Sequence, residues 1–155
     1  MKNGNLRIAY KTITDDHFPS RMEISFIDDE KRQTLVFEKK TWCIDNIKKG
    51  LRYGENPNQE AALYKLSSGS VCLGKKNHIQ SERYLASDII LLQSGKHPGK
   101  INITDADNAL NILRYLMDTP CVAIMKHNNP CGVAKGKNIL EAYQRANMAD
   151  RLAAF

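Results

Sequence analysis

The last third of the sequence alternates between helical and strand patterns, and this alternation constrains the fold more than any other feature. Apolar residues between positions 106 and 117 recur every three or four positions, which predicts an amphipathic helix that Pro120 stops. The unbroken apolar run at residues 121–125 then predicts a strand buried on both faces. A polar loop follows, and a second helix is expected to begin after an N-cap at Asn138. Helix, buried strand, loop and helix together indicate an α/β fold.

Residues 1–47 are predicted to form a strand-rich N-terminal lead. Residues 24–27 and 35–37 are short runs that contain β-branched and aromatic members. The acidic residues 28–30 between them favour a turn. A β-hairpin is therefore expected in this part of the chain.

The middle of the chain has a less regular pattern. Glycines and a proline interrupt any period between residues 48 and 59, which predicts a structured loop. A helical turn is expected over residues 61–64 and a short strand over residues 70–73. Residues 81–94 fit a helix, although the apolar run 89–92 fits a buried strand equally well.

Composition and charge exclude several classes of protein. The 155 residues are 42% hydrophobic and 26% charged, which is ordinary for a globular chain and excludes collagen-like and wholly disordered proteins. The apolar runs fall far short of the roughly 20 residues that span a bilayer, and no secretory signal is present, so we expect a cytoplasmic protein. The 23 basic and 17 acidic residues leave a net charge of +6, which favours anionic partners.

The four cysteines give no sign of a metal or redox motif. Cys43, Cys72, Cys121 and Cys131 lack the C-x-x-C spacing, so we expect reduced thiols, three in or near the core and Cys131 in a loop. His127 and Cys131 are conceivable as a metal pair, but zinc requires three or four ligands. No metal is therefore expected, and a nucleophilic role for Cys131 is less favoured still.

Lys126 and His127 follow the predicted buried strand, where open α/β sheets collect their ligands. A neutral imidazole can act as a general base near physiological pH, and a neighbouring ammonium can stabilise a developing oxyanion. Pro130 restricts the residues before it to an extended or turning path, so both side chains could reach one pocket. The alternative is a solvated Lys–His pair on a surface loop.

Arg52 and Tyr53 form a second candidate site within the predicted loop. The guanidinium offers a planar fork for a phosphate or carboxamide oxygen. The tyrosine adds a flat apolar face and a hydroxyl that suit a heterocycle. The alternative is a surface turn with a solvated arginine.

Polar residues also gather at the predicted start of the first helix. Thr104 and Asp107 have nearly the spacing of a capping box, and Asn102 and Asp105 lie beside them. Free backbone amides at such a helix start can hold an anion. More often, residues of this kind simply cap the helix.

Two stretches resemble the signatures of one enzyme family. Residues 51–64 resemble the L-R-Y-G-x-N-P-H-Q-x-A-A-x-Y signature of AICAR transformylase, the phosphoribosylaminoimidazolecarboxamide formyltransferase of purine biosynthesis, with Asn58 where histidine is common. Residues 126–134 resemble the family's K-H-x-N-P-C-G-x-A signature. Residues 99–105 are similar to the N-x-x-D element that lies between them. Order and spacing agree, and the resemblance covers roughly residues 50–155.

The resemblance implies formyl transfer from 10-formyltetrahydrofolate, as co-substrate, to the 5-amino group of AICAR, giving formyl-AICAR. His127 is then the expected proton acceptor, and Lys126 is expected to stabilise the tetrahedral oxyanion. No metal is required, because the formyl group is already electrophilic. The residues implied in substrate binding are Arg52, Tyr53, Asn102 and Asn129.

The resemblance also implies a fold and an assembly. The family's fold is similar to cytidine deaminase, a three-layer α/β/α sandwich, and its members are homodimers with active sites across the subunit boundary. Residues 48–155 are expected to form only the first part of the transformylase domain, so either this chain is an N-terminal fragment or it is not a working enzyme alone. Only about 50 residues precede the first motif, which implies a stand-alone transformylase without the partner cyclohydrolase.

Three other classes of protein were weighed against this interpretation. A non-catalytic dimerisation fragment remains an alternative. A basic nucleic-acid-binding module would show clustered Lys and Arg with interleaved aromatics, whereas the aromatic content is 7% and the charges are dispersed. A zinc deaminase would carry the H-x-E and P-C-x-x-C motifs, and neither occurs.

Overall fold

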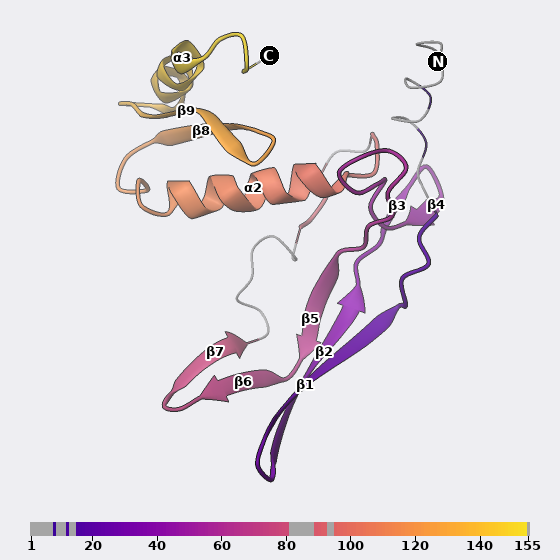
Figure 1. Cartoon of the computed structure of the whole chain (residues 1–155). Coiled ribbons are helices and arrows are strands. Elements are labelled where there is room, and N and C mark those ends of the chain that lie inside the picture. Colours follow the sequence, from indigo (N-terminus) through magenta and orange to yellow (C-terminus); the bar gives the residue numbers. More distant parts are fainter. Residues whose placement is uncertain (1–7, 9–11, 13–14, 81–88, 93–94, 155) are drawn as a thin grey trace. The chain divides into compact units, whose positions relative to one another are not determined.

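The computed structural model describes residues 8, 12, 15–80, 89–92 and 95–154. The chain divides into two compact units, Met1–Lys100 and Ile101–Phe155. Short sheets and helices make it a mixed α/β protein, as the sequence predicts (Figure 1). Within the described ranges, no helix is long and apolar enough to cross a membrane.

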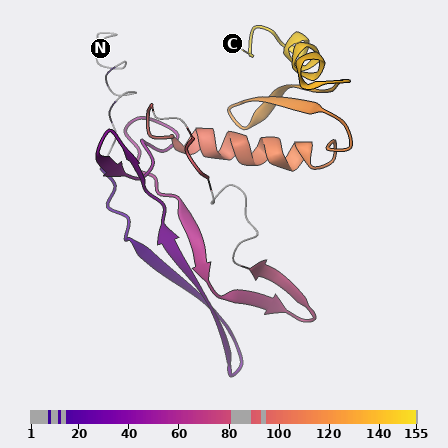
Figure 2. The ribbon, with the colours of Figure 1, turned by 180° about the vertical axis from the view of Figure 1, so that it is seen from behind.

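The predicted N-terminal hairpin is confirmed. Strands β1 (Arg21–Asp28) and β2 (Lys31–Lys39) pair antiparallel along their whole length, and the sheet is seen from the front in Figure 1 and from behind in Figure 2. Opposite charges meet near both ends of the ladder, where Arg21 faces Glu38 and Asp28 faces Lys31. The tight turn between the strands holds Asp29 in the left-handed region, with φ 50°.

Strand β5 (Tyr64–Ser68) adds to the other edge of β2, giving the sheet order β1-β2-β5. The helical turn predicted over residues 61–64 is wrong, because residues 61–63 are irregular and residue 64 begins this strand. The strand predicted over residues 70–73 is confirmed as β6 (Ser70–Leu73), which pairs with β7 (Lys76–Gln80).

The core of the first unit lies between these two sheets. Leu35 of β2, Leu66 of β5 and Val71 of β6 are all at most 5% exposed, and Phe37 and Ile79 pack against them. Alternation along β2 and β5 brings these side chains to one face of the sheet. The N-terminal strands thereby form a core of their own.

The predicted loop of residues 48–59 is partly strand. Strands β3 (Trp42–Ile44) and β4 (Ile47–Lys49) form a small hairpin, and the chain is irregular from residue 50 to residue 63. Residues 89–92 are irregular too, so they form neither the predicted helix nor the alternative strand. The rest of the helix predicted over residues 81–94 lies outside the described residues.

Helix α2 (Lys100–Leu113) is shifted toward the N-terminus from its predicted position. Thr104 is therefore not an N-cap, and its hydroxyl donates to the Ile101 carbonyl at 3.1 Å inside the helix. The helix ends at residue 113 rather than continuing to residue 117. The last carbonyls of the helix accept hydrogen bonds from amides three residues later, such as the bond from the Leu116 amide to the Leu113 carbonyl, instead of the α-helical bonds four residues later.

The largest departure from expectation follows α2. Much of the polar loop predicted over residues 126–132 belongs instead to strand β9 (Asn129–Lys135), which pairs antiparallel with β8 (Cys121–Lys126). Strand β8 is half-buried along its whole length, so the prediction of burial on both faces is wrong. The register shifts after Ile124, which leaves Cys131 as an extra residue in a bulge.

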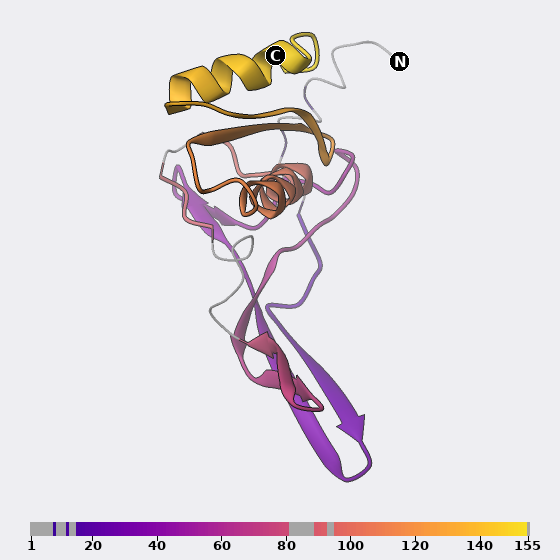
Figure 3. The same ribbon diagram turned by 90° about the vertical axis from the view of Figure 1, so that its left-hand side faces the viewer.

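Helix α3 (Ile139–Ala149) begins where the sequence predicts. The Asn138 side chain accepts a hydrogen bond from the Glu141 amide at 2.9 Å, and the Glu141 carboxylate accepts one from the Lys137 amide at 2.7 Å. Ala142 and Ala146 are the buried residues of α3, whereas Tyr143 of the helix and Leu152 beyond its end are exposed. The β8–β9 hairpin lies between α3 and α2 (Figure 3).

The cysteines are free thiols. Three of them are expected in or near the core, but none of the four is fully buried. Cys43 and Cys72 are exposed, and Cys121 and Cys131 are half-buried. Cys131 lies in strand β9 rather than in a loop.

Candidate active site

The side chains of the predicted pair, Arg52 and Tyr53, contact each other. The guanidinium carbon of Arg52 lies 4.6 Å from the centre of the Tyr53 ring, and Nη2 donates to the Tyr53 hydroxyl at 3.0 Å. Both side chains are half-buried. Nε of Arg52 is buried and meets no acceptor in the described part of the chain. The guanidinium thus retains donor capacity beyond the tyrosine.

The loop after this pair is closed by Gln59. Its side-chain oxygen accepts hydrogen bonds from the amides of Glu55 and Asn56, each at 3.1 Å. Its backbone carbonyl accepts the Gly54 amide at 2.8 Å. A Cβ at Gly54 would lie 3.0 Å from the Gln59 Cβ, so a larger residue here would require Gln59 to move slightly away.

Residues 98–100 hold the Arg52–Tyr53 pair at its backbone. The Arg52 amide donates to the Pro98 carbonyl at 2.8 Å, and the Lys100 amide donates to the Tyr53 carbonyl at 3.0 Å. The Lys100 ammonium donates to Glu55 at 2.6 Å, and this hydrogen bond lowers the pKa of the Glu55 carboxyl group. The backbone of the pair is therefore fixed both at the Arg52 amide and at the Tyr53 carbonyl.

Lys126 and His127 lie at the tip of the β8–β9 hairpin. Lys126 pairs with Asn129, so His127 and Asn128 are the two turn residues, with φ values of 52° and 65°. Positive φ at both positions is the pattern of a type I′ turn, whose twist matches that of the flanking strands. A left-handed conformation costs a non-glycine residue roughly 1–2 kcal/mol. The imidazole of His127 is exposed, and the Lys126 side chain is half-buried.

Two side chains of α2 contact the backbone of this turn. The Asp105 carboxylate accepts a hydrogen bond from the Asn128 amide at 2.6 Å, and the Asn108 amide group donates to the Asn128 carbonyl at 3.3 Å. Residues three apart on a helix share a face, which explains why both reach the same turn. The structure gives Asp105 a contact other than the predicted capping or anion binding.

The other predicted site residues are divided between α2 and β9. Asn102 is exposed in the first turn of α2, and Thr104 bonds within that helix. Asn129 is exposed at the start of β9, where its side chain donates to the His127 carbonyl at 3.0 Å. In the described residues, no three His, Cys, Asp or Glu side chains gather as metal ligands.

The structure brings the predicted residues together as two clusters. Arg52 and Tyr53 form one cluster in the first unit, and Lys126, His127 and Asn129 form another in the second. A single site composed of both clusters stays a prediction. Sequence reasoning missed the contact from Asn108, for which no pattern gives a signal.

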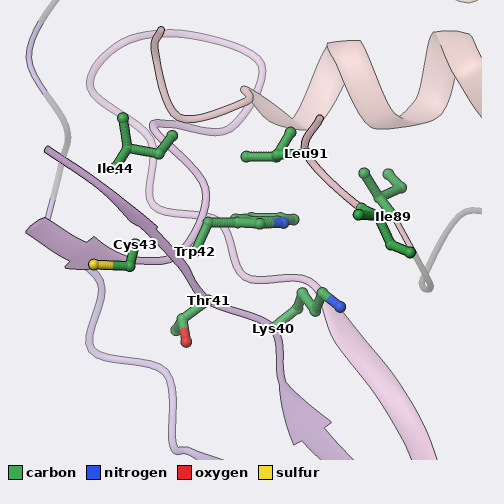
Figure 4. Close-up of a pocket in the computed structure, with 8 residues that line it drawn as sticks. Lys40, Thr41, Trp42, Cys43, Ile44, Ile89 and Leu91 are labelled. Atoms are coloured by element: carbon green, nitrogen blue, oxygen red, sulfur yellow. The ribbon is translucent and has the colours of Figure 1, made fainter. Parts of the chain in front are cut away.

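The cavity of about 390 Å³ in the first unit is separate from the predicted residues. Trp42 lines this cavity and is 8% exposed, and Figure 4 shows its indole ring beneath Leu91. Neither Arg52 nor Tyr53 is among its described lining residues, so this hollow is not the predicted nucleotide site. The lining residues are Lys40, Thr41, Trp42, Cys43, Ile44, Ile89, Ile90 and Leu91.

One family profile matches nearly the whole chain, and individual relatives match about two thirds to four fifths of it. Residues 9–155 match the sequence profile of the AICARFT/IMPCHase bienzyme family, which includes the N-terminal strands and both motifs. Three relatives carry the name bifunctional purine biosynthesis protein PurH. The one from Caldicellulosiruptor saccharolyticus is 41% identical over 105 residues, which are 68% of this chain and 18% of the relative. Those from Bacillus subtilis and Listeria monocytogenes serotype 4a are 38% identical over 125 residues and 42% identical over 120 residues.

These matches cover most of this chain but only a small share of each relative. The Bacillus match covers 79% of this chain and 20% of the relative, and the Listeria match covers 77% and 21%. This chain therefore spans about a fifth of the length of the curated relatives it matches.

Proposed function

This chain belongs to the AICARFT/IMPCHase bienzyme family, and we propose that it is part of an AICAR transformylase of purine biosynthesis. The reaction transfers a formyl group from 10-formyltetrahydrofolate to the 5-amino group of AICAR. The observation that carries the proposal is the family match over residues 9–155, which includes both motif stretches.

His127 and Lys126 are the proposed catalytic residues. The 5-amino nitrogen bonds to the formyl carbon, and His127 accepts the proton that the amine loses. Lys126 stabilises the oxyanion of the tetrahedral intermediate. The intermediate then breaks its bond to the folate nitrogen, to which His127 returns the proton. The exposure of the imidazole at the hairpin tip supports this role, since a substrate can reach it.

Arg52 and Tyr53 are proposed to hold the ribonucleotide, with Asn102 and Asn129 as further contacts. The free donor capacity of Arg52 suits a phosphate or carboxamide oxygen. The Tyr53 ring stacks on the guanidinium and supplies a flat apolar surface and a hydroxyl, which suit a heterocycle. The bonds from residues 98–100 pre-organise this pair, which lowers the entropy cost of binding.

For the fold and assembly, we propose the cytidine deaminase-like α/β/α sandwich and a homodimer. The β8–β9 hairpin between α2 and α3 supplies a layered element of that kind. A crystal structure of the complete protein tests the sandwich, and light scattering after gel filtration tests the dimer. A cytoplasmic location also stays a prediction.

The test is an assay of the protein made from the complete reading frame that contains this chain. Purified protein is mixed with AICAR and 10-formyltetrahydrofolate, and formyl-AICAR is detected by mass spectrometry. We expect turnover that depends on both substrates. The 155-residue chain assayed alone shows whether later residues are required. A complete protein that dimerises but forms no formyl-AICAR would instead favour the non-catalytic dimerisation fragment.

A further inference from the structure

The turn that carries His127 has a backbone conformation that requires support. His127 and Asn128 both have positive φ, and neither is glycine. Asparagine and histidine tolerate this region better than most residues, but they still populate it rarely without external contacts. Strained backbone at a reactive residue persists only where the surroundings hold it.

The support comes from one face of α2. The Asp105 carboxylate accepts a hydrogen bond from the Asn128 amide at 2.6 Å, and Asn108 donates one to the Asn128 carbonyl at 3.3 Å. Both backbone polar groups of Asn128 are thus fixed by side chains of a single helix. The bond from Asp105 is the shorter and is charge-assisted, which makes it the stronger of the two.

We propose that Asp105 is a positioning residue: it holds Asn128 in the left-handed conformation and thereby orients the neighbouring His127 imidazole. This inference rests on the proposed function, because it assigns His127 a reaction to catalyse. Asp105 accepts a hydrogen bond from the backbone amide of Asn128, so it affects the His127 imidazole only through the conformation of the turn. Its role requires a hydrogen-bond acceptor of this size and place, and does not require the negative charge.

The chain offers a matched set of variants. Asp105→Asn keeps an acceptor oxygen and removes the charge, whereas Asp105→Ala removes both. Asp107→Ala makes the same change on the same helix, at a carboxylate that has no hydrogen bond or ion pair with any described residue. The double variant Asp105→Ala with Asn128→Gly replaces the lost support with a residue that adopts positive φ freely.

Two measurements are made on the complete protein. Amide hydrogen exchange reports whether Asn128 is still bonded, independently of activity. Steady-state kinetics with AICAR and 10-formyltetrahydrofolate gives kcat and KM. In Asp105→Ala we expect fast exchange at Asn128 and a kcat loss of roughly 10²-fold, the effect that about 1 Å of misplacement can produce, with KM for AICAR unchanged. Asp105→Asn and Asp107→Ala keep slow exchange and most of kcat, and the double variant recovers part of the lost kcat.

Several outcomes would overturn the inference. Wild-type kcat in Asp105→Ala despite fast exchange at Asn128 would remove any role in positioning. An equal kcat loss in Asp107→Ala, or no recovery in a folded double variant, would leave only a general effect on stability. If the wild-type protein transfers no formyl group, the proposed function fails and the catalytic role falls with it. Exchange at Asn128 then still decides whether Asp105 holds the turn.

Discussion

Arg52 stacks on the ring of the residue that follows it, with its guanidinium carbon 4.6 Å from the Tyr53 ring centre and Nη2 3.0 Å from the hydroxyl. Among the described residues, the same arrangement occurs a second time, outside the motifs. Arg114 lies 4.7 Å from the ring centre of Tyr115 and donates to its hydroxyl at 2.7 Å. Adjacent Arg–Tyr stacking is therefore not specific to the motif, and a ligand-binding role must come from what surrounds Arg52.

Arg52→Ala should weaken nucleotide binding in the complete protein. A hydrogen bond to a charged group contributes about 1.5–3 kcal/mol, which corresponds to a rise of roughly 10- to 100-fold in the dissociation constant of AICAR. Titration calorimetry measures this constant. Arg114→Ala removes an arginine with the same stacking geometry and should leave it unchanged. Equal AICAR affinity in wild type and Arg52→Ala would exclude Arg52 from the site.

His127→Ala should abolish most turnover while the protein stays folded. Loss of a general base costs roughly 10²- to 10⁴-fold in kcat. His127 is exposed, so its removal leaves no cavity in the core. His17→Ala, a second exposed histidine outside the proposed site, is the control and should retain wild-type kcat. Turnover near that of the wild type in His127→Ala, with an unchanged circular dichroism spectrum, would disprove the proposed base.

Elements that depend on local pattern could be predicted from the sequence. The β1–β2 hairpin follows from two β-rich runs around an acidic turn, and its ladder places opposite charges across from each other. The start of α3 follows from the Asn138 cap, because the capping bond joins residues only three positions apart. In both cases the contacts that define the element lie within a few residues.

Elements set by distant contacts were predicted less well. Helix α2 begins at Lys100, whose amide is bonded to the Tyr53 carbonyl, and a contact over 47 positions leaves no local signal. Strand β9 contains Pro130 and Gly132, which normally indicate a loop. Pairing with β8 overrides this preference, and the bulge at Cys131 accommodates the proline.

The candidate site shows the same division. The residue types at positions 52, 53, 126 and 127 indicate their chemistry, because acid–base and anion-binding groups are few. The contact between Asp105 and Asn128 depends on how α2 lies against the hairpin turn. Sequence spacing alone placed Asp105 at a helix start, where capping was the expected role.

Gly132→Ala should destabilise the second unit strongly. A Cβ at this position would lie 1.9 Å from the Ala146 carbonyl oxygen and 2.8 Å from its carbon, and both belong to the backbone of α3. The helix would have to move away from β9, and overpacking of this kind costs about 1–3 kcal/mol or more in the free energy of unfolding.

Gly95→Ala is the matched control for this substitution, since no atom of the described residues lies within 4 Å of a Cβ there. Urea unfolding of both variants measures the difference in the free energy of unfolding. We expect Gly95→Ala to stay within about 0.5 kcal/mol of the wild type. An equally small effect of Gly132→Ala would mean that α3 does not pack this closely on β9.

The exposed pair His17–Glu60 should make one histidine titrate above its ordinary range. Nδ1 of His17 lies 2.9 Å from Glu60, and this hydrogen bond raises the pKa of His17 from 6.5. The hydrogen bond from the His17 amide lowers the pKa of Glu60 from 4.5. Because the pKa of His17 is raised, the ion pair is lost as the pH rises through this raised pKa. Because the pKa of Glu60 is lowered, the ion pair is also lost as the pH falls through this lowered pKa. The pair is therefore fully formed between about pH 4.5 and 6.5.

An NMR titration of the His17 ring measures this shift directly. In Glu60→Gln the midpoint should fall toward 6.5, because the partner charge is gone. Glu55→Gln removes a carboxylate that bonds Lys100 instead and should leave the His17 midpoint unchanged. A His17 midpoint that is the same in the wild type and in Glu60→Gln would show that the two side chains do not pair in solution. The segment around residue 17 would then be held by the other ion pairs of residues 15 and 16, which join it to Lys49 of β4 and Lys39 of β2.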